Sequence, residues 1–179
     1  MDTEWQISLN QKELLDVLFG GIEEKVEGVL DVGSGRTSIF YLTEKYKDII
    51  VEGIVYPGDD RKISPIRECV KNDNYKLIET DILDFNPEKS YDVILAHLFL
   101  GEAEKFGENK FEKVLAKLFA IGARYLIIVN LFRDNINYNL LLKRVSEYGD
   151  IIRIKHVVSE DGEISLGMLI KKSREPISF

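Results

Sequence analysis

Two glycines directly after an apolar run mark the segment of this sequence best suited to hold a ligand. The run Val29-Leu30-Asp31-Val32 leads into Gly33-Ser34-Gly35, and a helical pattern begins at Thr37. Glycine lets the main chain approach a ligand closely, and the free amides at the start of a helix attract polar or anionic groups. An acid at the end of an apolar strand is costly unless it is hydrogen-bonded. We therefore expect this acid and this loop to form a ligand-binding site, made of Asp31, Gly33, Ser34 and Gly35.

Polar residues at the ends of later apolar runs are further candidates for chemistry. His97 follows the run 91–95, and a histidine there can act as a general base, flank a ligand or be structural. Asn130 and Arg133 end the run 124–131 and are candidates for contact with a substrate. The carboxyl ends of parallel strands meet at one edge of a sheet, where open α/β folds bind ligands. No Cys/His cluster for zinc is visible, so no metal site is expected.

The elements that would position these residues alternate between strand-like and helix-like patterns. This alternation predicts a mostly parallel sheet with helices on both faces. Helices are expected at 10–25, 37–46, 64–71, 110–121 and 135–148, and strands at 26–32, 49–56, 75–79, 91–95 and 124–131. Gly20-Gly21 is expected to break the first helix near its end, and Pro65 suits the first position of the third helix.

The C-terminal part of the chain has a different pattern, with two strand-like runs and no helical run between them. Two strand-like runs, 151–159 and 163–171, flank Glu160-Asp161-Gly162, and Asp-Gly between such runs is typical of a hairpin. The expected fold is therefore an α/β three-layer sandwich with a mostly parallel seven-stranded sheet that ends in an antiparallel hairpin. Because 179 residues supply one core and not two ordinary ones, we expect a single domain over 1–179, with 1–25 as an N-terminal helical segment.

The composition of the chain limits the kinds of binding partner and the cellular compartment that we expect. The 24 basic and 31 acidic residues give a net charge of −7, which disfavours nucleic acid because its binders usually carry a basic face. No apolar run approaches the roughly 18 residues of a membrane helix, and the N-terminus lacks a secretion signal. The single cysteine, Cys69, cannot form an internal disulfide, which favours a reducing cytoplasm. A homodimer is compatible with these properties.

The motif Asp31-Val32-Gly33-Ser34-Gly35-Arg36-Thr37 resembles the first motif of the class I S-adenosylmethionine-dependent methyltransferases, which have a Rossmann-like fold. Thr37 stands where this family usually has a third glycine. The resemblance covers nearly the whole chain and includes the closing hairpin. It implies S-adenosylmethionine as cofactor, with Asp81 on the adenine amino group, Ile82 beside it and His97 flanking the cofactor.

One position departs from the family pattern. The resemblance implies an acidic residue for the ribose hydroxyls at the end of the second strand, and Val55 stands there. The sequence therefore indicates a divergent member, expected to methylate a small molecule or a protein. The alternatives are a degenerate binding protein with a pocket but no turnover, and a nicotinamide-dinucleotide enzyme. The last is disfavoured by Ser38, where its fingerprint has glycine, and by the closing hairpin.

Overall fold

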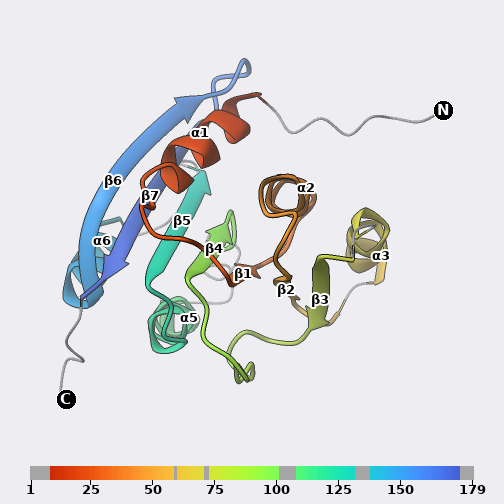
Figure 1. Ribbon diagram of the computed structural model, residues 1–179. Helices are drawn as coiled ribbons and strands as arrows, with labels where there is room; N and C mark the ends of the chain where they lie inside the picture. The colour runs from red at the N-terminus through yellow and green to blue at the C-terminus, as the bar shows by residue number, and fades with distance from the viewer. Residues whose placement is uncertain (1–8, 59, 71–72, 101–107, 132–137, 174–179) are drawn as a thin grey trace.

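A single seven-stranded sheet forms the centre of the computed structural model, which describes residues 9–58, 60–70, 73–100, 108–131 and 138–173 (Figure 1). The strands follow the order β3-β2-β1-β4-β5-β7-β6. Their bounds are β1 Val29–Val32, β2 Val51–Val55, β3 Tyr75–Glu79, β4 Val93–His97, β5 Tyr125–Leu131, β6 Gly149–Val158 and β7 Ile164–Lys172. The helices are α1 Leu9–Phe19, α2 Arg36–Lys45, α3 Asp60–Cys69, α5 Glu108–Ala120 and α6 Tyr138–Tyr148.

Helices cover both faces of the sheet, so the molecule has three layers (Figure 1). Successive strand residues point to opposite faces, and the core is accordingly divided into two clusters. One cluster lies beneath α1, α2 and α3. It includes Leu14, Leu18, Ile39 and Leu42, and the partly buried Ile66 of α3 packs against it. The other lies beneath α5 and α6, and it includes Val114, Leu118, Leu141 and Val145. No helix among the described residues is long and apolar enough to cross a membrane.

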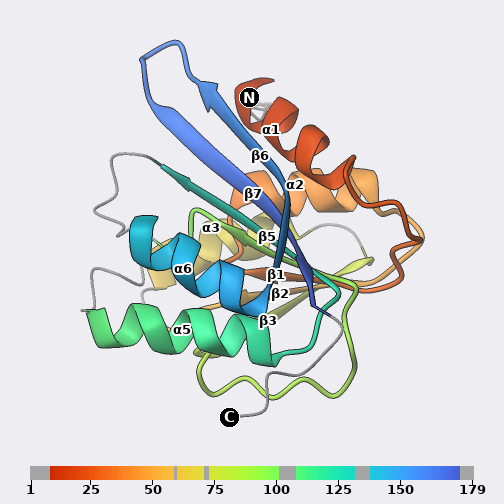
Figure 2. The ribbon, with the colours of Figure 1, turned by 90° about the vertical axis from the view of Figure 1, so that its left-hand side faces the viewer.

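The pairing of the strands confirms the expected fold class. β1 pairs in parallel with β2 and β4, and the outer pairs β2–β3 and β4–β5 are parallel too. β7 is antiparallel to both β5 and β6, and the hairpin of β6 and β7 projects beyond the other strands (Figure 2). Gly162 closes the hairpin turn with a φ of 84°, a conformation that favours glycine.

Several boundaries differ from those expected. α1 ends at Phe19, ahead of the Gly20-Gly21 pair that was expected to break it. The expectation for Pro65 was wrong, because α3 begins at Asp60 and Pro65 lies inside it. Pro65 is the sixth of the ten residues of α3, past the first turn, so its missing N–H removes one hydrogen bond from the helix. β4 extends to His97, so this histidine ends the strand and does not follow it.

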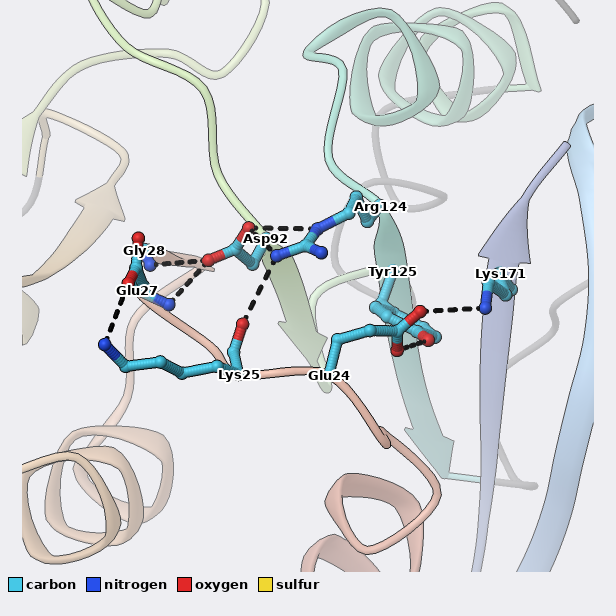
Figure 3. A network of polar contacts seen from close by, with 8 residues as sticks. All are labelled: Glu24, Lys25, Glu27, Gly28, Asp92, Arg124, Tyr125 and Lys171. Carbon is cyan, nitrogen blue, oxygen red and sulfur yellow. Dashed lines mark hydrogen bonds and ion pairs between the residues drawn. The ribbon is translucent and has the colours of Figure 1, made fainter. Parts of the chain in front are cut away.

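A polar network fastens the amino edge of the sheet, opposite the glycine loop (Figure 3). Asp92 accepts the backbone N–H groups of Glu27 at 2.5 Å and Gly28 at 3.0 Å, and it pairs with Arg124 at 2.5 Å. Although partial burial opposes the change, these hydrogen bonds hold the pKa of Asp92 below its usual value. The segment between α1 and β1 is thereby tied to the residues that directly precede β4 and β5.

Candidate ligand-binding site

The glycine loop lies at the carboxyl edge of the sheet, between β1 and α2. Gly33 has a φ of 74°, and the ring of Phe99 packs so closely against it that a Cβ would overlap the ring. The N–H groups of Gly33 and Ser34 donate to the carbonyl oxygen of Ile54 at 3.0 and 2.9 Å. These two amides therefore hold the loop on β2, and they already have a partner within the protein.

Asp31 is fully buried, and its carboxylate faces inward. Its Oδ2 accepts hydrogen bonds from the hydroxyls of Ser38 and Tyr75, each at 2.6 Å, while Oδ1 has no partner among the described residues. Burial raises the pKa of Asp31 to about 6, although the hydrogen bonds from Ser38 and Tyr75 act in the opposite direction. A buried carboxylate with these bonds joins β1, α2 and β3 into one unit.

The Tyr75 hydroxyl reaches Asp31 because Gly53 lies between them on β2. A Cβ at Gly53 would overlap both the Tyr75 hydroxyl and the Ser34 Oγ. Ser34 is itself buried, and its Oγ lies 2.9 Å from the Tyr75 hydroxyl. The side chains of Asp31 and Ser34 are thus part of a buried polar cluster, which sequence reasoning did not find because Tyr75 is 44 residues from Asp31.

Gly35 is the loop residue that opens onto free space. It is the N-cap of α2, and a Cβ built on it would meet no atom of the described residues within 4 Å. Its N–H lies 3.2 Å from the Ser38 Oγ. The start of α2 is therefore accessible at the edge where the sequence predicts a ligand, and the dipole of the helix favours polar or anionic groups there.

The ends of β2 and β3 place the next candidates beside this loop. Val55 is the last residue of β2 and is buried, so it presents no acid at this position. Of the two acids that could reach back from the following loop, Asp59 lies outside the described residues and Asp60 begins α3. Ile82, in the turn after β3, is buried and packs in the core under α5 and α6.

Asp81, also in the turn after β3, has a partner on each carboxylate oxygen. Its Oδ1 accepts the Leu83 N–H at 3.0 Å, and its Oδ2 lies 3.3 Å from the Nζ of Lys110 on α5. The same ammonium lies 5.1 Å from the ring centre of Tyr56, which follows β2. Neither Tyr56 nor Lys110 stood out in the sequence, because only the fold brings the ends of β2 and β3 to the start of α5.

His97 is buried at the end of β4, and it faces α1. Its Nε2 lies 3.0 Å from Gln11 Oε1, and Gln11 Nε2 donates to Ser165 Oγ at 2.7 Å. Burial lowers the pKa of His97 to about 4, so the ring is neutral at pH 7. The next residue, Leu98, has a φ of 55°, which is rare for a residue with a side chain and is often found at functional sites.

Of the two residues predicted to contact a substrate, Asn130 and Arg133, only Asn130 lies among the described residues. Asn130 ends up buried near the end of β5, 1% exposed, and neither its Oδ1 nor its Nδ2 has a partner among the described residues. Because buried amides are nearly always hydrogen-bonded, the donor and the acceptor of Asn130 are candidates for hydrogen bonds with a ligand group. Arg133 lies outside the described residues. Over the described part of the chain, no group of three or more His, Cys, Asp or Glu side chains could hold a metal ion.

Comparison with known proteins concerns the fold. No family model matches the sequence, and no curated protein matches it. Solved structures do match the fold. The N-methyltransferase NodS from Bradyrhizobium japonicum WM9, solved with S-adenosyl-L-homocysteine, is 14% identical with a TM-score of 0.70, and the match covers 97% of this chain and 94% of NodS.

Two further structures show the same similarity. The 1,6-didemethyltoxoflavin-N1-methyltransferase of Burkholderia thailandensis is 13% identical with a TM-score of 0.68, over 92% of this chain and 79% of that one. The 16S rRNA methylase RmtB is 21% identical with a TM-score of 0.60, over 93% of this chain and 63% of that one. The chain has the class I methyltransferase fold. In this chain, the glycine loop and Asp81 both lie at the carboxyl edge of the sheet.

Proposed function

We propose that this protein is a methyltransferase that uses S-adenosylmethionine and acts on a small molecule or a protein. The observation that carries the proposal is the accessible Gly35 at the start of α2, at the same sheet edge as the carboxylate of Asp81. The solved structures with this fold include methyltransferases crystallised with S-adenosylhomocysteine, which supports the same cofactor.

The residues of the edge fit this cofactor in part. Free space at Gly35 suits a polar group at the start of a helix, and Asp81 can accept the adenine amino group. Val55 offers no acceptor for ribose hydroxyls, so we expect weaker binding than an acid at this position would give. When bound, S-adenosylmethionine supplies an electrophilic methyl group, and the transfer requires mainly alignment with the acceptor.

The roles of His97 and Asn130 follow from their surroundings. The pKa of about 4 makes His97 a weak proton acceptor, so we propose that it flanks the cofactor and shapes the site. Asn130 is the proposed contact with the acceptor, because its amide has an unused donor and an unused acceptor among the described residues.

The methyl acceptor, the cellular location and the oligomeric state are also part of the proposal. Structures with this fold include a methyltransferase of 1,6-didemethyltoxoflavin and a methylase of 16S rRNA, so the fold alone does not select the acceptor. The net charge of −7 supports a small molecule or protein, and the lone Cys69 supports a cytoplasmic location. The edge strand β6 exposes Ile152, Ile154 and Val158, which supports pairing with a second copy.

A second candidate is a binding protein with the same pocket and no turnover, which the absence of an acid at Val55 favours. Isothermal titration calorimetry with S-adenosylhomocysteine and NAD tests which cofactor the protein binds. We expect binding of S-adenosylhomocysteine only, and weaker binding by Asp81→Asn. No binding at millimolar concentration would refute the proposed cofactor. Binding without methylation of any acceptor in a broad panel would favour the binding protein.

A further inference from the structure

Lys110 occupies an unusual place for a lysine. It is the third residue of α5, where the helix dipole disfavours a positive charge, and its side chain is only 26% exposed. Two of its partners among the described residues offset this cost. The ammonium lies 3.3 Å from Asp81 Oδ2 and 5.1 Å from the ring centre of Tyr56. The start of α5 is thereby joined to the turn after β3 and to the residue after β2.

The same two partners form a receptor for a flat base with an exocyclic amino group. A carboxylate accepts a hydrogen bond from such an amino group, and an aromatic face stacks on the ring. Tyr56 is 57% exposed, so its ring is available at the surface. Asp81 Oδ1 is already bonded to the Leu83 N–H, which leaves Oδ2 as the oxygen that an incoming donor would use. That oxygen is the one paired with Lys110.

We propose that Lys110 is an internal competitor of the cofactor, whose ammonium takes the place of the adenine amino group on Asp81 until the cofactor displaces it. The inference rests on the proposed function, because it assigns adenine to Asp81 and Tyr56. Lysine has a long, flexible side chain, so displacement requires no movement of the helix. The competition makes the affinity for an adenosine compound depend on the strength of one partly buried ion pair.

The size of the effect follows from the contacts of Lys110 with Asp81 and Tyr56. An ion pair at a partly exposed site and a cation–π contact each change an equilibrium by roughly two- to fivefold. Removing both contacts therefore predicts an affinity about 4- to 25-fold higher. Because salt weakens the ion pair and adenosine itself is uncharged, added salt should tighten adenosine binding to the native protein.

The test uses calorimetric titration of the full chain with adenosine and with S-adenosylhomocysteine. Lys110→Met keeps the length of the side chain and removes its charge. Lys113→Met is the matched control, since Lys113 is exposed on the same helix. We expect Lys110→Met to bind both compounds about 4- to 25-fold more tightly and to lose the salt dependence for adenosine, while Lys113→Met behaves as the native protein.

Each other outcome has a defined meaning. Equal or weaker binding by Lys110→Met, with the native protein binding normally, overturns the competitor role and leaves the proposed function standing. Binding by Lys110→Met alone supports the competitor role. No binding by any of the three proteins overturns the proposed function together with this inference. If Lys110→Met is not folded, as thermal unfolding would show, the salt dependence of the native protein decides. Unchanged or weaker adenosine binding at higher salt then overturns the inference.

Discussion

Replacing Asp31 by asparagine should change how the stability of this protein depends on pH. Burial raises the pKa of Asp31 from 3.8 to about 6 in the folded protein. The folded state therefore binds this proton more tightly than the unfolded chain does. Protonation of Asp31 consequently favours folding below pH 4, and this contribution is lost as the pH rises to 6. Asparagine cannot titrate, so the variant lacks the effect.

The magnitude follows from the displacement of the pKa. At about 1.4 kcal/mol for each pKa unit, the full displacement corresponds to about 3 kcal/mol. Because Asp31 of the unfolded chain is already more than half ionised at pH 4, the contribution of Asp31 to the free energy of unfolding falls by about 2 kcal/mol between pH 4 and pH 7. The free energy of unfolding of Asp31→Asn, relative to that of the native protein, should rise by the same amount over this range. His97 also titrates here, but it is present in both proteins and cancels in the difference.

Urea unfolding at pH 4, 5, 6 and 7, followed by circular dichroism, measures this difference. Tyr75→Phe is a second variant, and its free energy of unfolding at pH 7 should fall relative to that of the native protein. It removes one hydrogen bond to the carboxylate, so it should raise the pKa of Asp31 further and lower the stability at pH 7 by about 2 kcal/mol. Parallel pH profiles for the native protein and Asp31→Asn would show that Asp31 is not the buried acid described above.

Two further predictions concern Gly53 and His97. Gly53→Ala should lower the free energy of unfolding by about 1–3 kcal/mol, because the added methyl group overlaps the Tyr75 hydroxyl. In the double variant, Tyr75→Phe should recover part of this loss, and simple addition of the two losses would contradict the contact. NMR titration should find His97 neutral down to about pH 5, with its pKa near 4. The contribution of His97 to the free energy of unfolding is then present above pH 6.5 and lost as the pH falls toward 4. A measured pKa near 6.5 would mean that the ring is solvated.

Much of the fold could be predicted from local patterns. The alternation of strands and helices, the glycine turn after Val32 and the hairpin around Gly162 each depend on residues close together in the sequence. The extent of α3 could not, because the sequence placed Pro65 at the start of that helix. A proline marks the first turn of a helix only by preference, and neighbouring residues can extend the helix backward.

The candidate site was harder to predict, because its contacts cross the sheet. The glycine loop pointed to the correct edge, yet the partners of Asp31 include Tyr75, which reaches it only because Gly53 has no side chain. The contact of Asp81 with Lys110 likewise depends on the position of α5 over the turn after β3. Composition and spacing carry no information on such pairs, which form when the strands assemble.

The position of β7 has a consequence for the order in which this protein is built. β7 lies between β5 and β6, although it is synthesised after both. Until β7 leaves the ribosome, β5 has an open edge and β6 has no strand beside it. The sheet therefore cannot close during translation of the preceding elements, and its open edge is exposed to association with other chains during that interval. Loss of β7 would thus divide the sheet in its interior, and a truncated chain should aggregate.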